Sequence, residues 1–303
     1  MSETDEVFDS LEALLGAAAG RSCCAVVGNP IAHSLSPTIH AHCGRLCHVP
    51  LFYGKWQLTA EHFVEAVRAF FHAGGLGLNV TVPFKEQALA VCDALTERAI
   101  VAGAVNTLWC DGRQLWGDNT DGVGLVNDLK GRCGLPLMGN EVLILGAGGA
   151  ARGIVAPLFS AGVSAIAVAN RTRQKAEKIV ACFKEDEEKG IQKQGALSVV
   201  TADAIRATPF DVIINATGAG LTGQVPALQA SWFGSNTAVY DMMYAPLTQP
   251  QRDTAFLAHV VSTYGVTACW DGLGMLVEQA SVAFARWFDQ NPDVVSVRRI
   301  LEA

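Results

Sequence analysis

Residues 141–162, EVLILGAGGAARGIVAPLFSAG, combine a short apolar run, a glycine-rich turn and a segment of helical character. This order predicts a strand, a turn and a helix, as in a dinucleotide-binding unit. Glycines permit the sharp bend and a close backbone approach to a pyrophosphate, whose charge the helix N-terminus favours. The predicted cofactor-binding residues of the turn are Gly146, Ala147, Gly148, Gly149 and Ala150.

The next apolar run, SAIAVAN at 164–170, indicates which dinucleotide is bound. NAD-binding units usually end this strand with an acid that accepts from the ribose hydroxyl, but here three cations follow it. An arginine can hold a 2'-phosphate through paired N–H groups, and such a charge-assisted bond contributes about 1.5–3 kcal/mol. We therefore predict NADP(H) as the cofactor. Arg171 is the predicted phosphate-binding residue, and Asn170, Thr172 and Lys175 adjoin it.

Further apolar runs, FDVIINATG at 210–218 and TAVYDMMY at 237–244, alternate with helical segments. Continuous apolar strands that alternate with helices predict a parallel sheet covered on both faces. The 303 residues are enough for two α/β domains. We expect a Rossmann-like NADP-binding domain at 122–271, and a substrate-binding catalytic domain formed by 1–121 plus 272–303. The apolar helix predicted at 271–288 would return to the first domain.

Composition limits the class of protein. The formal net charge of -7 argues against a nucleic-acid partner, which normally meets a basic surface. No apolar run reaches the ~18 residues of a membrane span, and the acidic start is unlike a secretory signal, so we expect a cytoplasmic protein. The 9 cysteines indicate reduced thiols. The cluster HAHCGRLCH at 40–48 lacks a second ligand pair, and we expect no metal site.

The first half of the chain alternates strands and helices less regularly. CCAVVGNP at 23–30 predicts a buried strand, followed by a helix with Ser36 at its N-cap. A second helix is predicted to open at Thr59, and a third to run from Lys85 to about Arg98. Residues 106–122 predict a β-hairpin.

Polar side chains recur where these predicted strands and turns end. Each alone has a structural explanation, such as a helix cap, a turn or an exposed lysine. Together, ahead of a dinucleotide turn, they predict a substrate pocket. They are Ser34, Ser36, Asn79, Thr81, Lys85, Asn106 and Asp121.

The chain resembles the shikimate dehydrogenase family in motifs that follow one another in the same order from about Ala25 to the last helices. The motifs are GNPIAHSLSP, GLNVTVPFK, LTERA, GAVNT, GDNTDGVGL, GAGGAARG, NRT, INATG, YDMMY and DGLGMLVEQA. The resemblance implies reversible, NADPH-dependent reduction of 3-dehydroshikimate to shikimate, within the biosynthesis of chorismate and the aromatic amino acids.

The resemblance also implies a role for each matching residue. Lys85 would be the catalytic acid and base, with Asp121 as its partner. Ser34 and Ser36 would bind the substrate carboxylate. The substrate hydroxyls would be bound by Thr81, Asn106, Asp121, Tyr244 and Gln279, with Asn79 close by. Met242, Gly272 and, more weakly, Glu97 would lie beside the nicotinamide.

Two alternatives stay open at this point. A quinate dehydrogenase, or a dual quinate and shikimate dehydrogenase, would share the fold; such relatives tend to lose the second serine or the basic residues, which are kept here as Ser36, Arg171 and Lys175. A non-catalytic NADPH-binding regulator would have no need of Lys85 and Asp121. Family members include monomers and dimers, so a homodimer is an open expectation, as is closure of the two domains.

Overall fold

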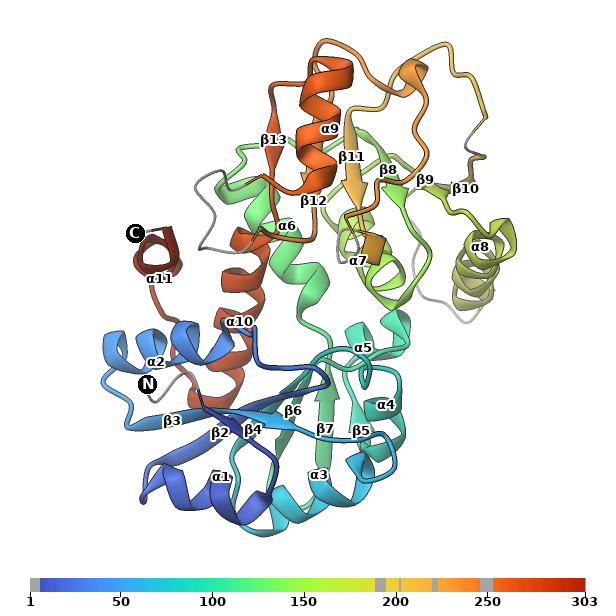
Figure 1. Cartoon of the computed structure of the whole chain (residues 1–303). Helices are drawn as coiled ribbons and strands as arrows, with labels where there is room; N and C mark the ends of the chain where they lie inside the picture. The colour runs from blue at the N-terminus through green and yellow to red at the C-terminus, as the bar shows by residue number, and fades with distance from the viewer. Residues whose placement is uncertain (1–5, 189–194, 202, 220–222, 246–252, 303) are drawn as a thin grey trace. The chain divides into compact units, whose positions relative to one another are not determined.

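The computed structural model describes residues 6–188, 195–201, 203–219, 223–245 and 253–302. The chain divides into two compact units (Figure 1). Unit 1 comprises Met1–Gly124 and Val277–Ala303, and unit 2 comprises Leu125–Leu276. The chain therefore leaves unit 1 within one helix and returns within another, so that unit 1 is built from both ends of the sequence.

Unit 1 has a 7-stranded sheet of order β1-β3-β2-β4-β6-β7-β5 among its described residues. Strands β1 to β4 are parallel, and β6 and β7 form the predicted antiparallel hairpin. The elements are β1 Val7–Phe8, α1 Leu11–Ala18, β2 Ser22–Gly28, α2 Ser36–Leu46, β3 Leu51–Gln57, α3 Phe63–His72, β4 Gly77–Val80, α4 Gln87–Val91, β5 Ala94–Leu95, α5 Glu97–Ala102, β6 Thr107–Cys110 and β7 Leu115–Asp118. Helix α6, Asp121–Gly131, begins in unit 1, α10, Leu273–Phe288, ends there, and α11, Val294–Glu302, follows.

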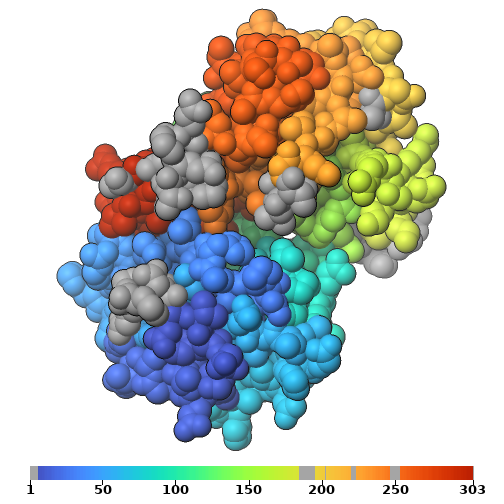
Figure 2. Space-filling model, viewed as in Figure 1, coloured from blue at the N-terminus to red at the C-terminus, as the bar shows by residue number. Residues whose placement is uncertain are grey.

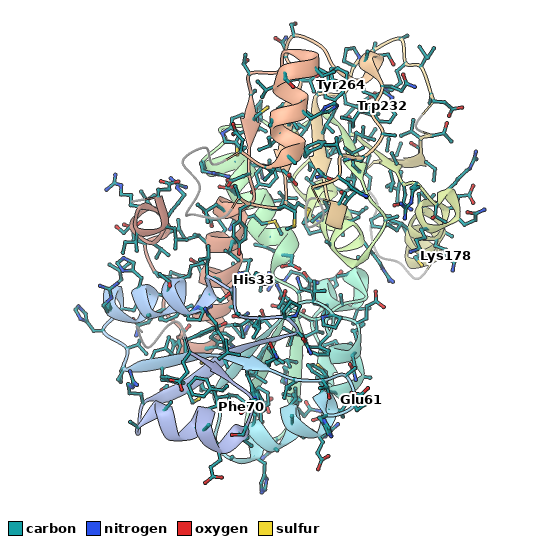
Figure 3. The ribbon with its side chains drawn as sticks, viewed as in Figure 1. His33, Glu61, Phe70, Lys178, Trp232 and Tyr264 are labelled. Atoms are coloured by element: carbon teal, nitrogen blue, oxygen red, sulfur yellow. The ribbon has the colours of Figure 1, made fainter. Side chains whose placement is uncertain are left out.

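Alternation along the strands gives unit 1 two apolar clusters on opposite faces of the sheet. On β3, Phe52 and Trp56 join a cluster with residues of α1, α3, α4 and α5, in which Phe70, labelled in Figure 3, is fully buried. Tyr53, from the same strand, joins the other cluster with Trp287 and residues of β2. The sheet is therefore covered on both faces, as expected for a mostly parallel arrangement.

Three local predictions for the first half of the chain are wrong. The helix predicted from Lys85 to about Arg98 is instead α4, β5 and α5, because the backbone is extended at Cys92 and Thr96 caps a new helix. Helix α3 begins at Phe63 and not at Thr59. The Thr59 side chain forms a hydrogen bond with the His62 ring and does not cap the helix. Ser36 is the first residue of α2 rather than its N-cap.

The segment before the strand predicted at 23–30 contains β1 and α1, which were not predicted from the sequence. Strand β1 pairs with β3, and Ser10 caps α1 by accepting a hydrogen bond from the Ala13 amide. Leu14 is fully buried in the larger cluster of unit 1, where it packs against Gly54. In Figure 2 the dark-blue atoms of this segment form one continuous surface with the rest of unit 1.

Unit 2 has a 6-stranded parallel sheet of order β10-β9-β8-β11-β12-β13 among its described residues. This is the 3-2-1-4-5-6 order of a Rossmann fold, with β8 at the centre. The elements are β8 Glu141–Leu145, α7 Gly149–Ser160, β9 Ala165–Ala169, α8 Arg173–Glu188, β10 Ala196–Val199, β11 Val212–Asn215, η2 Ala230–Trp232, β12 Ala238–Asp241, α9 Ala255–Tyr264 and β13 Cys269–Trp270. The predicted α/β fold with a Rossmann-type second domain is confirmed.

The two faces of this sheet are covered by different helices. Residues of α6, α7 and α8 pack with Ile144 and Ile214 on one face. Residues of α9 pack with Leu143, Ile213 and Trp232 on the other, and Trp232 is fully buried there (Figure 3). The apolar strand runs are thus explained by burial on both sides, and because the strands are parallel, the turns that follow them lie at one edge of the sheet.

Candidate functional site

Lys85 and Asp121, 36 residues apart in the sequence, form an ion pair in unit 1. Lys85 lies in the turn after β4, two residues before α4, and Asp121 is the first residue of α6. The Lys85 Nζ donates to Asp121 Oδ2 at 2.6 Å, and the two side chains are 28% and 11% exposed. A carboxylate in the first turn of a helix is also favoured by the helix dipole. The result is an ammonium that is oriented but still reachable from solvent.

Asn106 holds the other oxygen of the same carboxylate. Its Nδ2 donates to Asp121 Oδ1 at 2.8 Å, and its Oδ1 accepts from the Thr120 backbone amide at 2.9 Å. The same Nδ2 lies 3.4 Å from Gln279 Oε1 on α10. Gly124 makes this approach feasible, since a Cβ there would lie 2.7 Å from the Gln279 backbone nitrogen. Asp121 is therefore fixed on both oxygens.

Asn79, on β4, continues the network away from the ion pair. Its Nδ2 donates to the Asn106 carbonyl and to Thr107 Oγ1, both at 3.2 Å. Its Oδ1 accepts from the Tyr53 hydroxyl at 2.7 Å, and burial raises the pKa of Tyr53 well above its ordinary value, which keeps that phenol a donor. Asn79 is 6% exposed, so its amide is used largely within the protein.

The loops that carry Ser34 and Thr81 are joined directly. The Thr81 amide donates to the Val27 carbonyl at 2.9 Å, and the Asn29 amide donates to the Val82 carbonyl at 3.1 Å. A Cβ on Gly28 would lie 2.5 Å from a Thr81 methyl carbon, so the close approach requires glycine. Within the first loop, the Ser36 amide donates to Ser34 Oγ at 3.3 Å. The structure thus places Ser34, Ser36 and Thr81 on two connected loops at the ends of neighbouring parallel strands.

An ion pair that the sequence did not reveal supports the start of α6. Asp118, at the end of β7, is 1% exposed and accepts from Thr96 Oγ1 at 2.6 Å and from Arg98 Nε at 3.0 Å. Burial raises its pKa, but the hydrogen bonds and charge of Arg98 and the bond from Thr96 outweigh burial, so the pKa lies below its ordinary value. Glu97, the predicted residue between these two partners, is exposed.

In unit 2, Gly146 begins the turn between β8 and α7. Its φ is +109°, a conformation that favours glycine, and a Cβ there would lie 3.0 Å from the Ala216 carbonyl oxygen. Gly148 is the extended N-cap of α7 and offers no side chain to the helix N-terminus. The amides of the first turn therefore remain available to an anion, with space left by the absent side chains.

Residues 170–175 follow β9 and lead into α8. The Asn170 side chain donates to the Thr172 carbonyl at 2.8 Å, and the Lys175 amide donates to the same carbonyl at 3.0 Å. Arg171 is exposed, and no ion pair occupies it in the described part of the chain. Arg173 instead pairs with Glu177 at 2.8 Å. The exposed guanidinium of Arg171 and the hydrogen-bonded side chain of Asn170 suit a nucleotide phosphate. Figure 3 shows a further cation, Lys178 of α8, extending outward.

The turn after β11 is held by a buried pair that the sequence prediction missed. Asn215 Nδ2 donates to Asp241 Oδ1 at 3.0 Å, and Asn215 Oδ1 accepts from Thr217 Oγ1 at 2.7 Å. The Asp241 carboxylate also accepts from the Met243 amide at 3.1 Å, and burial raises its pKa. Both residues end apolar strands, a position that could have marked them.

The remaining predicted residues divide between the units. Gly272 has no room for a side chain beside the backbone of Met242, so these two loops of unit 2 lie in contact. Tyr244 is half-buried in unit 2, and burial raises its pKa. Tyr244 belongs to a different unit from the other predicted substrate residues, and Glu97 to a different unit from the other predicted cofactor residues. Their roles stay predictions.

Two residues of the His and Cys cluster at 40–48, His40 and Cys43, are buried in the core, and His48 is exposed. His40 is fully buried, stacks on Tyr53 with ring centroids 4.2 Å apart, and has its pKa lowered by burial to about 3. Within residues 6–188, 195–201, 203–219, 223–245 and 253–302, no group of three His, Cys, Asp or Glu could hold a metal ion. Over the same residues, no helix is long and apolar enough to cross a membrane.

Comparison with known families gives three matches along the chain. The shikimate dehydrogenase substrate binding domain matches residues 26–108. The shikimate / quinate 5-dehydrogenase family matches residues 130–223, and the shikimate 5'-dehydrogenase C-terminal domain matches residues 272–302.

Individual proteins agree with these matches. A shikimate dehydrogenase (NADP(+)) of Alcanivorax borkumensis is 44% identical over 272 residues, which cover 90% of this chain and 93% of that protein. An Ael1 enzyme from Pseudomonas putida has a crystal structure with a TM-score of 0.81 and 35% identity, covering 92% of this chain and 98% of that one. A Thermus thermophilus shikimate 5-dehydrogenase in complex with NADP(H) and shikimate has a TM-score of 0.76 and 31% identity, covering 92% and 97%.

Proposed function

The chain belongs to the shikimate dehydrogenase family of NADP-dependent oxidoreductases that act on a CH–OH group, and we propose that it reduces 3-dehydroshikimate reversibly to shikimate, with Lys85 and Asp121 as its acid–base pair. The observation that carries the proposal is the 2.6 Å ion pair between these two side chains. It lies among the polar residues that the family resemblance assigns to the substrate. Because the chain resembles this family, we assign the proposed reaction to chorismate and aromatic amino-acid biosynthesis.

The proposed reaction needs a hydride on the carbonyl carbon and a proton on the carbonyl oxygen. The bound cofactor supplies the hydride. Lys85 is the proton donor, because an ammonium within hydrogen-bond reach polarises a carbonyl and then protonates its oxygen, an effect of about 10²–10⁴-fold on rate. Asp121 orients the ammonium, and in the reverse direction the neutral amine of Lys85 accepts the alcohol proton. Asn106 keeps the carboxylate oriented through its second oxygen.

The substrate would be recognised by neutral donors and acceptors around this pair. In the proposal, Ser34 and Ser36 bind the carboxylate, and Thr81, Asn106 and Gln279 bind the hydroxyls, with Asn79 close by. The resemblance to the family adds Tyr244. Support comes from the connection between the two loops of unit 1, which holds the hydroxyl groups of Ser36 and Thr81 on one framework. Such a pocket rejects an analogue that leaves one polar group unpaired.

The residues of unit 2 fit a dinucleotide phosphate. Gly146 leaves the space that a side chain would fill, and the Gly148 N-cap offers no side chain to the first amides of α7, which can therefore face an anion. Arg171, supported by Asn170, Thr172 and Lys175, would bind the 2'-phosphate. In the proposal, Met242 and Gly272 line the nicotinamide position, with Glu97 as a weaker candidate.

Quinate as the substrate is the alternative of the same class. It differs from shikimate in its hydroxyl pattern, so the polar residues of the pocket rather than the fold would decide between them. The presence of Ser36 and of exposed Arg171 favours shikimate and NADP. A non-catalytic regulator is disfavoured because its chain would not need a paired Lys85 and Asp121.

An absorbance assay of the reduced nicotinamide tests the proposal. The full-length protein is given shikimate or quinate, each with NADP or NAD, and kcat/KM is measured for the four pairs. We expect shikimate with NADP to be the best pair. Efficient turnover of quinate with NAD would support the alternative enzyme, and no turnover with any pair would support the regulator.

A further inference from the structure

Lys55, on the second strand of the unit 1 sheet, is buried although it carries an ammonium group. It lies on β3 between Val26 of β2 and Val7 of β1, and only 6% of the residue is exposed. Removing an ammonium from water is costly unless polar groups replace its hydration. A lysine at this depth therefore requires an explanation in the groups that it contacts.

The strand alternation fixes the direction of the Lys55 side chain. Phe52 and Trp56 face the cluster formed with α1 and α3, and Tyr53 faces the opposite cluster, which contains Ile31. Lys55 is two residues after Tyr53 on β3, so its side chain projects from the same face of the sheet, the face that carries Ile31. Its side chain rises on the face where the loop between β2 and α2 crosses the sheet, and Figure 3 labels His33 on that loop.

The Lys55 ammonium contacts this loop directly. Its Nζ donates to the Ala32 carbonyl at 2.7 Å, a short charge-assisted hydrogen bond. Ala32 is followed two residues later by Ser34, whose amide donates to the Ile31 carbonyl at 3.0 Å and whose Oγ accepts from the Ser36 amide at 3.3 Å. The Lys55 bond thus ties the sheet to the turn that orients both serines.

We propose that Lys55 is a positioning residue for the substrate carboxylate: it holds the Ala32 carbonyl and, through that carbonyl, fixes the Ser34 and Ser36 hydroxyls for an anionic group. This rests on the proposed function of the two serines. The ammonium also places a positive charge beneath the loop and offsets the negative end of the Ala32 carbonyl, and both effects favour an anion. In the proposal Lys55 acts through the loop, so its effect belongs on substrate affinity.

Steady-state kinetics of Lys55→Met, which keeps most of the apolar side chain but removes the donor and the charge, test the proposal. We expect KM for shikimate to rise about tenfold, with kcat within about twofold and KM for NADP unchanged. Lys130→Met removes a lysine from an exposed position on α6 and is the matched control, with all three constants unchanged. A fall in kcat without a change in KM for shikimate would overturn the proposal.

A double-mutant cycle with Ser34→Ala separates an effect on the loop from general damage. If Lys55 acts through the loop, the Lys55→Met change should raise KM for shikimate by less than about threefold once Ser34 is already Ala. Two independent tenfold effects that multiply would overturn the proposal. If Ser34→Ala alone leaves KM unchanged, the proposed role of the serines fails instead, so the two failures are distinguishable.

Amide hydrogen exchange provides a measurement that does not depend on activity. Lys55→Met should speed exchange of the Ser34 and Ser36 amides at least about tenfold, while Val80 on β4 keeps its rate. Unchanged exchange at both serines would overturn the proposal whatever the substrate is. If Lys55→Met does not fold, Lys55→Gln is used in the same measurements; its amide is a neutral donor one bond shorter than the ammonium, so we expect smaller changes in the same direction, and no change in any of them would overturn the proposal.

Discussion

In unit 1 the proposed site residues are joined side chain to side chain, whereas in unit 2 the backbone shapes the proposed nucleotide site. Lys85, Asp121 and Asn106 are linked by bonds of 2.6 and 2.8 Å, and the network continues into the core. The turn at Gly146 depends on its φ of +109°, and Arg171 extends from the surface. Small polar groups of a substrate need fixed partners, while a phosphate can be bound by backbone amides and one mobile cation.

The comparison predicts that side-chain removal in unit 1 affects chemistry most strongly. Lys85→Ala removes the proton donor, and we expect kcat to fall by about 10²–10⁴-fold while KM for shikimate changes little. Steady-state kinetics in the absorbance assay measure both. Lys130→Ala, at an exposed lysine, is the control and should keep full activity. Retained kcat in Lys85→Ala would show that another group donates the proton.

In unit 2 we expect that removal of the Arg171 side chain changes the affinity for NADP and not the rate of the chemical step. Arg171→Ala should raise KM for NADP by about 10–100-fold, the value of a lost charge-assisted bond, and leave KM for NAD within about twofold. Arg173→Ala is the matched control, because that guanidinium is already paired with Glu177. Equal effects on NADP and NAD would contradict a 2'-phosphate contact by Arg171 and weaken the contrast between the units.

The sequence predicted unit 2 better than unit 1 because short, adjacent segments of the sequence determine the fold of unit 2. Apolar strands, the turn at Gly146 and the following helix are adjacent in the chain, and together they determine the Rossmann order of the sheet. In unit 1 the predicted helix from Lys85 to about Arg98 fails, because Thr96 starts a new helix after an extended segment. A cap residue is a weak signal inside a long apolar pattern.

The side-chain and backbone partners near the proposed site could not be predicted from the sequence. Asp118 and Arg98 are 20 residues apart and meet only because β5 pairs with β7, with Leu95 opposite Gly117. Register of this kind depends on the tertiary packing of both strands, which no short window of sequence contains. The same holds for Lys55, whose partner Ala32 is 23 residues away.

Asp118 gives the smallest expected effect, and it acts on stability rather than on the reaction. Asp118→Asn removes the charge that pairs with Arg98, and we expect the free energy of unfolding at pH 7 to fall by about 1–3 kcal/mol. The pKa of Asp118 lies below the ordinary 3.8, so its stabilisation is present above that pH and is lost as pH falls through the folded-state pKa. The difference between the variant and the parent should therefore shrink below about pH 4.

Urea unfolding between pH 3 and 7 measures this difference, with Asp9→Asn as the control. Asp9 is an exposed carboxylate of the same unit, between β1 and α1. Its variant should follow the parent across the pH range. A loss in Asp118→Asn that stays constant down to pH 3 would mean that the carboxylate charge contributes nothing. The network of unit 1 would then be held by hydrogen-bond geometry alone, as the turn of unit 2 is held by its backbone.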